Sequence, residues 1–445
     1  MNHRSLFAWS ITAALAGFLF GFDTIVISGA EQKIQSVWSL DGVMHGLAMS
    51  AALWGTVTGA LIGGWPTERL GRRQTLLWIG VLYFVSAVWS GLATGSGVFM
   101  FARFIGGVGV GIATVASPLY ISEIAPAGLR GRLAGMFQFN IVLGVLVAFV
   151  SNYLIGQNVD EAIAWRWMLG VEAFPAIAYT LLCFTLPESP RWLIVHAGRR
   201  AEGMEIFRRI NPDFTGAQIE SLADSVEASA GDRSTPAKLF TRQLRIPIML
   251  AILIAFFNQL SGINAVLYFA PRIFEWTGLA KNAALLQSVG IGIVNIFCTY
   301  LGLYLIDKLG RRTLLYIGSV GYILSLGICA WAFHVKSYEI VPICIFAFIG
   351  AHAIGQGAVI WVFISEIFPN RNRAAGQALG SSTHWFFAAS LTLAFPKMAE
   401  ALPPAVIFGF FCFMMCLQLL WVKLMVPETK NVPLEEMQKR LGVAV

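Results

Sequence analysis

Glu68-Arg69-Leu70-Gly71-Arg72-Arg73 closes one apolar run, and 239 residues later Asp307-Lys308-Leu309-Gly310-Arg311-Arg312 closes another. Two further motifs recur at nearly the same spacing: Ser122-Glu123-Ile124-Ala125-Pro126 as Ser365-Glu366-Ile367-Phe368-Pro369, and, more loosely, Pro187-Glu188-Ser189 as Pro427-Glu428-Thr429. Because three landmarks return in one order, the chain reads as two copies of one half, joined in tandem.

The composition places both halves in a membrane. Charged residues make up 12% of the chain, against about 25% in soluble domains, and the mean hydropathy is +0.70. We therefore predict an all-α membrane protein with twelve transmembrane helices in two pseudo-symmetric six-helix bundles, since each apolar segment is close to the ~20 residues that cross a bilayer. The segments are 6–28, 45–65, 74–95, 98–121, 133–155, 166–186, 246–270, 286–306, 313–333, 340–364, 374–396 and 403–426.

The repeat and the apolar segments together suggest how the chain is divided. We predict an N-terminal bundle over 1–186, a cytoplasmic linker with short helices over 187–245, a C-terminal bundle over 246–426 and a cytoplasmic tail over 427–445. The first apolar run lacks an obvious cleavage site, so we interpret it as a retained helix and not as a signal peptide. The glycines between Gly106 and Gly111 suit close helix packing in lipid.

Basic residues indicate the orientation, because Lys and Arg near the membrane are retained on the cytoplasmic side. With the N-terminus inside, 23 of the 31 Lys and Arg residues are cytoplasmic and six are outside. Both termini are then cytoplasmic, and the short loops suit a plasma membrane. This topology accounts for the net charge of +7 without a nucleic-acid partner.

An enzyme is not expected. The chain shows no spacing of nucleophile and base, no phosphate loop outside the membrane and no cluster of metal ligands. All six cysteines fall inside predicted spans, where neither a disulfide framework nor a zinc site is expected. The sequence therefore predicts no cofactor and no metal, and nothing in it requires a second copy of the chain, so we expect a monomer.

Several motifs in fixed order resemble a known family, and the match runs nearly end to end. The chain is similar to the sugar porters of the major facilitator superfamily in these stretches: Gly21-Phe22-Asp23-Thr24, both Gly-Arg-Arg loops, Pro118-Leu119-Tyr120-Ile121-Ser122-Glu123, Pro187-Glu188-Ser189-Pro190-Arg191-Trp192, Gln259-Leu260-Ser261-Gly262-Ile263-Asn264 and Pro427-Glu428-Thr429-Lys430. The resemblance implies the fold of that superfamily and a monosaccharide, moved through the lipid bilayer together with a proton, as the substrate.

Carboxylates and arginines gather at the predicted cytoplasmic ends of the helices in both halves. Opposite charges there can pair across neighbouring helices and form a gate on the cytoplasmic side, or they can be topology signals at solvated helix ends. Their repetition in both halves favours the gate, as the resemblance also implies. The predicted gate residues are Arg69, Arg72, Arg73, Glu123, Arg130, Glu188, Arg311, Arg312, Glu366, Arg373 and Glu428.

Two charged residues lie well inside apolar spans of the first half. Asp23 in the first helix and Arg103 in the fourth would each cost about 2.5–3.5 kcal/mol at a helix centre, so neither is expected to face lipid. A conformational change that alters their separation would load or release a proton. The resemblance favours this role, since proton-coupled sugar porters carry an acid at this position of the first helix. The alternative is a static pair that holds the two helices together.

A sugar site needs amide side chains, which both donate and accept hydrogen bonds, and an aromatic ring for the C–H face of the sugar. Gln259 and Asn264 share a face only if their helix is broken, which Gly262 permits. The candidates, which also match family sugar contacts, are Gln138, Asn258, Gln259, Asn264, Asn295 and Trp361, with Phe20, Tyr268 and Trp385 as aromatic walls implied by the resemblance. The alternative is bundle packing by buried amides.

The chain departs from the family pattern at two positions of this site. Asn258 stands where Gln is usual, and His384 stands where Asn or Gln is usual. These changes leave the choice of sugar open. The main prediction is proton-coupled sugar import; the alternatives are a facilitative uniporter and a sugar sensor that binds without transport.

Overall fold

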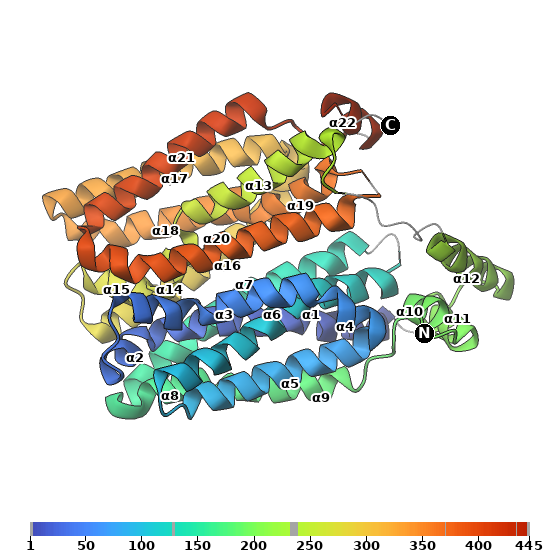
Figure 1. Cartoon of the computed structure of the whole chain (residues 1–445), viewed down its shortest axis with the longest axis horizontal. Coiled ribbons are helices and arrows are strands. Elements are labelled where there is room, and N and C mark those ends of the chain that lie inside the picture. The colour runs from blue at the N-terminus through green and yellow to red at the C-terminus, as the bar shows by residue number, and fades with distance from the viewer. Residues whose placement is uncertain (1–2, 127–129, 232–238, 370, 433, 443–445) are drawn as a thin grey trace.

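The protein is a bundle of long helices that divides into two halves. The computed structural model describes all residues except 1–2, 127–129, 232–238, 370, 433 and 443–445. The first half contains α1 (His3–Val26), η1 (Ile27–Gly29), α2 (Glu31–Val37), α3 (Gly42–Ile62), α4 (Gly64–Arg69), α5 (Arg72–Gly91), α6 (Ser96–Ile124), α7 (Arg130–Asn158), α8 (Glu161–Gly170) and α9 (Ala173–Cys183). Figure 1 shows these helices lying side by side, below the second half.

The second half repeats the arrangement of the first. It contains η2 (Arg242–Leu244), α13 (Arg245–Leu260), α14 (Ile263–Tyr268), α15 (Ala270–Glu275), α16 (Lys281–Leu309), α17 (Arg311–Val335), η3 (Tyr338–Ile340), α18 (Val341–His352), η4 (Ala353–Gly357), α19 (Ala358–Ile367), α20 (Arg373–Ala401) and α21 (Pro404–Met425). Between the halves lie α10 (Pro190–Val195), α11 (Arg200–Ile210) and α12 (Gly216–Gly231), and α22 (Leu434–Arg440) follows the last long helix. The prediction of an all-α fold in two six-helix bundles is confirmed.

Ten of the described helical segments are long and apolar enough to cross a membrane. The other two predicted spans are helical as well, but one is broken and the other is more polar than the ten. The span at 166–186 is broken between α8 and α9, near Val171 and Glu172, and the span at 374–396 is the continuous but more polar helix α20, which carries His384. Large apolar side chains such as Phe297 (70% exposed) and Leu424 (70% exposed) face outward, as lipid contacts require.

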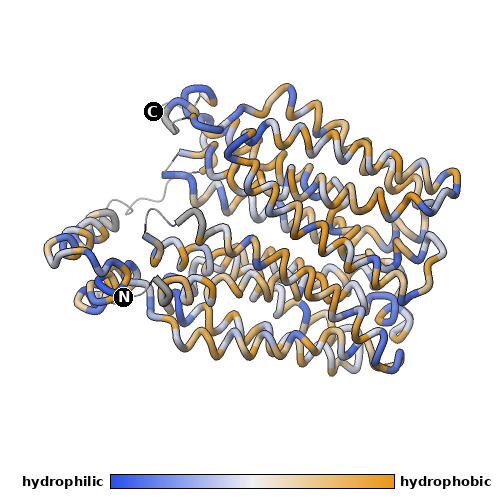
Figure 2. Tube along the Cα trace, turned by 180° about the vertical axis from the view of Figure 1, so that it is seen from behind, coloured by the Kyte–Doolittle hydropathy of each residue, from blue (hydrophilic) through white to orange (hydrophobic). Residues whose placement is uncertain are grey.

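The two ends of the molecule differ. Both termini and α10–α12 lie at one end, which we call the linker end, whereas α2, α8 and α15 lie at the opposite, distal end (Figure 1). Hydrophobic residues predominate along the long helices, and hydrophilic residues gather toward the two ends and in α10–α12 (Figure 2). The polar ends and the apolar middle give the molecule the profile of a protein that spans a bilayer.

Glycines bring α3 and α6 into close contact, as the run between Gly106 and Gly111 predicts. A Cβ atom built on Gly107 would lie 1.8 Å from the carbonyl oxygen of Ala52, and one on Gly59 would lie 2.2 Å from that of Val108. Backbones this close are possible only without a side chain, and small residues at interfaces are the usual means of helix packing in lipid.

The main contacts between the bundles are two equivalent ones. α3 packs against α20, and α7 packs against α16. The internal repeat relates α3 to α16 and α7 to α20, so one pair of contacts is the pseudo-symmetric copy of the other. Gly46 of α3 lies directly against α20, where a Cβ atom would lie 2.0 Å from the carbonyl oxygen of Leu393. Two equivalent contacts suit bundles that rock against one another about a central site.

Gly107→Ala is expected to lower the thermal midpoint of unfolding in detergent. The added methyl group would force α3 and α6 apart, at the cost of about 1–3 kcal/mol that overpacking usually carries. Gly409→Ala is the matched control, because a Cβ atom there meets no other atom within 4 Å. Equal midpoints for the two variants would contradict this account of the packing.

Candidate functional site

Two matching clusters lie at the linker end, one in each bundle. Gly71 and Gly310 precede α5 and α17 with φ angles of 93° and 92°, which glycine adopts readily. The Glu188 carboxylate accepts hydrogen bonds from the backbone N–H groups of Arg72 (2.9 Å) and Arg73 (3.1 Å). Glu428 does the same for the first two residues of α17, at 2.9 and 3.1 Å. Each carboxylate therefore caps a helix N-terminus, where negative charge is stabilised.

An arginine in each cluster holds a second carboxylate. Arg72 donates from Nε and Nη2 to Glu123 at 2.9 and 2.8 Å, and Arg311 donates in the same way to Glu366 at 3.0 and 2.7 Å. Both are bidentate charge-assisted pairs between helices of one bundle. Burial raises the pKa of Glu188, although its backbone hydrogen bonds oppose this shift.

The remaining predicted gate residues flank these clusters. Arg73 and Arg312 donate to backbone carbonyls at the ends of the neighbouring spans, at 2.9 and 2.8 Å. The Arg69 guanidinium lies over the ring of Trp65, 5.4 Å from its centroid. Arg373 begins α20, whereas the side chain of Arg130 lies outside the described part of the structure.

The buried ion pair that the sequence predicts is formed. Arg103 Nη1 donates to Asp23 Oδ1 at 2.5 Å, and Nη2 donates to Oδ2 at 3.3 Å and to the backbone carbonyl of Asp23 at 2.8 Å. Each side chain is 1% exposed. The pair links α1 and α6 in the interior of the first bundle, where neither charge faces lipid.

A second carboxyl group, which the sequence analysis missed, belongs to this site. Glu172 lies in the break between α8 and α9, is 1% exposed and interacts electrostatically with Asp23 and Arg103. Its two carboxyl oxygens have no hydrogen-bond partner among the described residues. An acidic residue inside the predicted span 166–186 was the available signal. Two carboxylates beside one guanidinium leave an excess negative charge, which is costly in a dry interior, so this cluster is suited to hold a proton.

Three of the predicted amides of the second bundle, Asn258, Gln259 and Asn264, form one cluster, which we call the amide cluster. α13 ends at Leu260, Gly262 has a φ angle of 87°, and α14 begins at Ile263, so the helix is broken where expected. Asn264 then donates to Gln259 at 2.7 Å, and Gln259 donates to Asn258 at 2.9 Å. The Gln259 amide nitrogen also lies 3.1 Å from Nε2 of His384.

The cluster continues through residues that the sequence analysis did not single out. Asn258 donates weakly to Gln356 at 3.5 Å, Gln356 donates to Gln418 at 2.9 Å, and Gln418 donates to Ser319 at 2.8 Å. Gln356 lies in the π-helical turn η4, a feature that is frequent at functional sites. Both glutamines are fully buried in apolar spans, which is the signal that could have found them.

Aromatic side chains border the amide cluster and reach the other bundle. The ring of His384 lies between those of Trp361 (5.1 Å) and Trp385 (4.8 Å), and Trp385 contacts Phe20 of α1 at 5.4 Å. Tyr268 lies four residues after Asn264 on α14, one helical turn further along the same face.

Tyr268 also connects the two sites. Its hydroxyl group has no hydrogen-bond partner among the described residues but lies in the electrostatic field of both members of the Asp23–Arg103 pair, although Tyr268 belongs to the other bundle. One short helix therefore carries a residue of the amide cluster and a residue beside the buried charges.

Two predicted sugar contacts lie apart from these hydrogen bonds. Gln138 is half-buried on α7, and Asn295 is half-buried on α16, the two helices that meet where the bundles touch. Asn295 accepts a long hydrogen bond of 3.4 Å from Thr299 of its own helix. Among the described residues, neither amide joins the amide cluster in this conformation.

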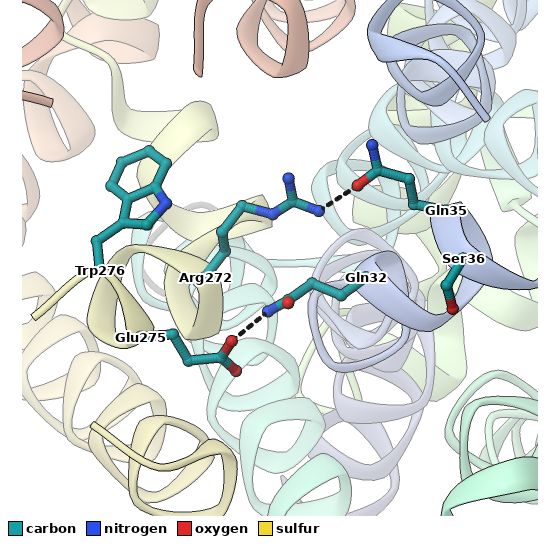
Figure 3. A pocket seen from close by; sticks show the side chains of 6 residues that line it. All are labelled: Gln32, Gln35, Ser36, Arg272, Glu275 and Trp276. Carbon is teal, nitrogen blue, oxygen red and sulfur yellow. Dashed lines mark hydrogen bonds between the residues drawn. The ribbon is translucent and has the colours of Figure 1, made fainter. Parts of the chain in front are cut away.

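A polar pocket of about 430 Å³ lies at the distal end and not at the amide cluster. α2 of the first bundle and α15 of the second bundle supply its lining (Figure 3). Arg272 donates to Gln35 at 2.6 Å, and Gln32 donates to Glu275 at 3.0 Å, so its polar groups bind each other across the bundles. We assign the amide cluster as the candidate sugar site because its helix break and aromatic rings match the predicted chemistry. Within the described ranges, no three His, Cys, Asp or Glu residues are placed to hold a metal ion.

Two six-helix bundles that enclose an amide cluster and a buried ion pair have the architecture of a secondary transporter. Residues 9–441 match the family of sugar (and other) transporters, and the chain belongs to this family, the sugar porters of the major facilitator superfamily. It is 33% identical to the arabinose-proton symporter of Bacillus subtilis (97% of this chain, 94% of the relative) and 33% identical to the D-xylose-proton symporter of Escherichia coli K12 (98% and 96%). The inward open conformation of the E. coli xylose transporter matches with a TM-score of 0.87 at 30% identity, covering 98% of this chain and 99% of the other. As a member of a transporter family, the chain is not an enzyme.

Gln259→Ala is expected to weaken D-xylose or D-glucose binding to the purified protein by about tenfold or more. It removes the amide at the centre of the cluster, and losing one or two hydrogen bonds of about 0.5–1.5 kcal/mol each corresponds to that change. Isothermal titration in detergent measures the affinity. Asn158→Ala is the matched control, since this exposed amide binds only its own helix at Leu154. Unchanged affinity in Gln259→Ala would remove the amide cluster from the sugar site.

Proposed function

We propose that the protein imports a monosaccharide, either a pentose or a hexose, together with a proton, by alternating access of a central site to the two sides of the plasma membrane. The observation that carries this proposal is the buried Asp23–Arg103 pair with Glu172 beside it, facing a bundle that holds the amide cluster. A uniporter would need neither charge in its interior. The symporters among the relatives support the same conclusion, and favour it over the uniporter and the sensor.

In this function the linker end lies in the cytoplasm, because most Lys and Arg residues of the connections gather there. The chain then divides into bundles over 1–186 and 246–426, with the linker 187–245 and the tail 427–445 in the cytoplasm. The protein then acts as a monomer.

In this orientation the described conformation is closed at the outside. Side chains of α2 and α15 bind each other across the bundles at the distal end, whereas Arg72 and Arg311 pair with carboxylates of their own bundle at the linker end. The two linker-end clusters would form the cytoplasmic gate, whose charges can meet across the bundles when the inner side closes.

Tyr268 offers a physical route for coupling. A sugar bound at Asn264 would hold α14 in place, and Tyr268 on the same face would then fix the surroundings of Asp23 and Arg103. Protonation of the carboxyl cluster would neutralise its excess charge and free the first bundle to move against the second.

Asp23→Asn is expected to abolish uphill transport and to spare exchange. The amide cannot bind and release a proton, but it keeps the shape of the protonated carboxyl group. In proteoliposomes, an inward gradient of one pH unit can drive sugar accumulation up to about tenfold in a one-to-one symporter, and the variant should only equilibrate. The measurement is uptake of radiolabelled D-xylose, D-glucose and L-arabinose with and without a protonophore.

Glu220→Gln serves as the control for Asp23→Asn, because Glu220 is an exposed carboxylate in the linker helix α12. Protonophore-sensitive accumulation by Asp23→Asn would show that Asp23 is structural. Equilibration by the unaltered protein regardless of the gradient would refute symport itself.

Tyr268→Phe is expected to keep sugar binding within about twofold but to lower the accumulation ratio. The ring remains as an aromatic wall, while the hydroxyl group, a dipole that lies in the field of the buried charges and has no hydrogen-bond partner among the described residues, is lost. Parallel titration and uptake measurements separate the two effects. Tyr300→Phe, on the lipid-facing side of α16, should change neither quantity. Normal accumulation by Tyr268→Phe would exclude its hydroxyl group from coupling.

A further inference from the structure

Glu31 at the start of α2 has partners from both bundles. Its carboxylate accepts two hydrogen bonds from Arg272 of α15, from Nε at 2.9 Å and from Nη2 at 2.8 Å. It also lies 3.1 Å from Nε2 of His45, in the first turn of α3. Arg272 belongs to the second bundle, whereas Glu31 and His45 both belong to the first. The side chains of Glu31 and His45 are fully buried.

We propose that these three residues form an outer lock, in which His45 replaces Arg272 as the partner of Glu31 when the bundles separate at the distal end. The inference rests on the proposed function, since it requires that the bundles alternate. The Arg272–Glu31 pair holds the outer side closed. Protonated His45 then makes the open state accessible, so acid on the distal side favours opening.

The charge on Glu31 favours such an exchange of partners. A buried carboxylate that loses its only cation is strongly destabilised. When the distal end opens, Arg272 moves away with the second bundle, but His45 stays beside Glu31 because only residues 38–41 separate α2 from α3. A proton taken up by His45 restores the lost positive charge.

The present geometry of His45 fits a partner held in reserve. Its Nε2 atom is close to Glu31, yet neither ring nitrogen makes a hydrogen bond of acceptable geometry within the described structure. Arg272 already occupies both carboxylate oxygens. Among side chains, histidine is the one that can gain a positive charge at the pH values at which a proton gradient operates, once water reaches it.

Other charged groups around His45 are already accounted for. On α3 itself, the Asp41 carboxylate caps the helix by accepting from the backbone N–H of Met44. On α20, Glu400 lies beside Gly42 and is 3.6 Å from Lys397. On α6, Arg103 is held by Asp23. The side that faces α15 presents the ring of Phe269, edge-on at a centroid distance of 6.0 Å. Glu31 is therefore the carboxylate with which a protonated His45 can pair.

Neighbouring contacts reinforce the lock. Arg272 also donates to Gln35, and Gln32 donates to Glu275, so α2 and α15 are joined at several points (Figure 3). The exposed pair Lys281–Glu161 also joins the bundles at this end, at 2.8 Å, with side chains 46% and 71% exposed. An ion pair as exposed as this one contributes little to the free energy that holds the bundles together, so Lys281 is a matched control for Arg272.

The test is hydrogen–deuterium exchange of the full chain in nanodiscs, without sugar. Arg272→Gln is expected to raise exchange several-fold in residues 31–37 and 270–276, while Lys281→Gln leaves it unchanged. Unchanged exchange in Arg272→Gln would overturn the lock.

A second arm of the test addresses His45. In the unaltered protein, exchange at these segments, corrected for its intrinsic pH dependence, should rise several-fold from about pH 7.5 to about pH 5.5, across the range in which histidine titrates. His45→Gln should abolish that rise, and Lys281→Gln should retain it. A rise that persists in His45→Gln would overturn the exchange of partners.

Glu31→Gln provides an independent variant if His45→Gln does not fold. It removes the charge that needs a partner, so it too should abolish the response to pH; a persisting response would overturn the proposal. Hydrogen–deuterium exchange reports the separation of α2 from α15 at the distal end and not the transport of sugar. The lock can therefore fail while symport stands, and symport can fail while the lock stands.

Discussion

A charge inside a lipid-spanning bundle needs a partner or a neutralising proton, and this requirement governs the charged sites of the structure. Asp23 and Arg103 pair with each other in the first bundle, and Glu172 is left over as a carboxyl group without a hydrogen-bond partner among the described residues. At the distal end, Glu31 is compensated across the bundles by Arg272. Movement of the bundles changes which partners are available, so conformation and protonation are linked through the same charges.

The internal repeat supplies the scaffold on which these charges act. Gly71 and Gly310 adopt nearly the same backbone conformation, and each is followed by a helix that is capped by a distant carboxylate. The contacts between the bundles are copied as well, α3 with α20 and α7 with α16. Function departs from this symmetry: the buried ion pair lies in one bundle and the amide cluster in the other. The short helix α14 brings the two sites together through Tyr268.

Sequence reasoning predicted the spans because hydropathy and the repeat are properties of the chain itself. It identified the Asp23–Arg103 pair because two charges in apolar spans need one another, and it expected the break at Gly262 from the spacing of two amides. It overlooked Glu172, which stands among apolar residues at a helix break. It also passed over Gln356 and Gln418, whose connection to Asn258 depends on a π-helical turn and on three separate helices.

The sequence by itself determined that the chain lies in a membrane, that it has twelve spans and that its two halves repeat. It also supplied the charged and amide side chains inside those spans. All of these follow from composition and local spacing. Only the tertiary structure decided which of those side chains meet, because partners 80 residues apart, such as Asp23 and Arg103, or 241 apart, such as Glu31 and Arg272, are set by how whole helices pack. It also decided which end of the molecule is closed. Closure depends on contacts between bundles, and the chain encodes more than one arrangement of these.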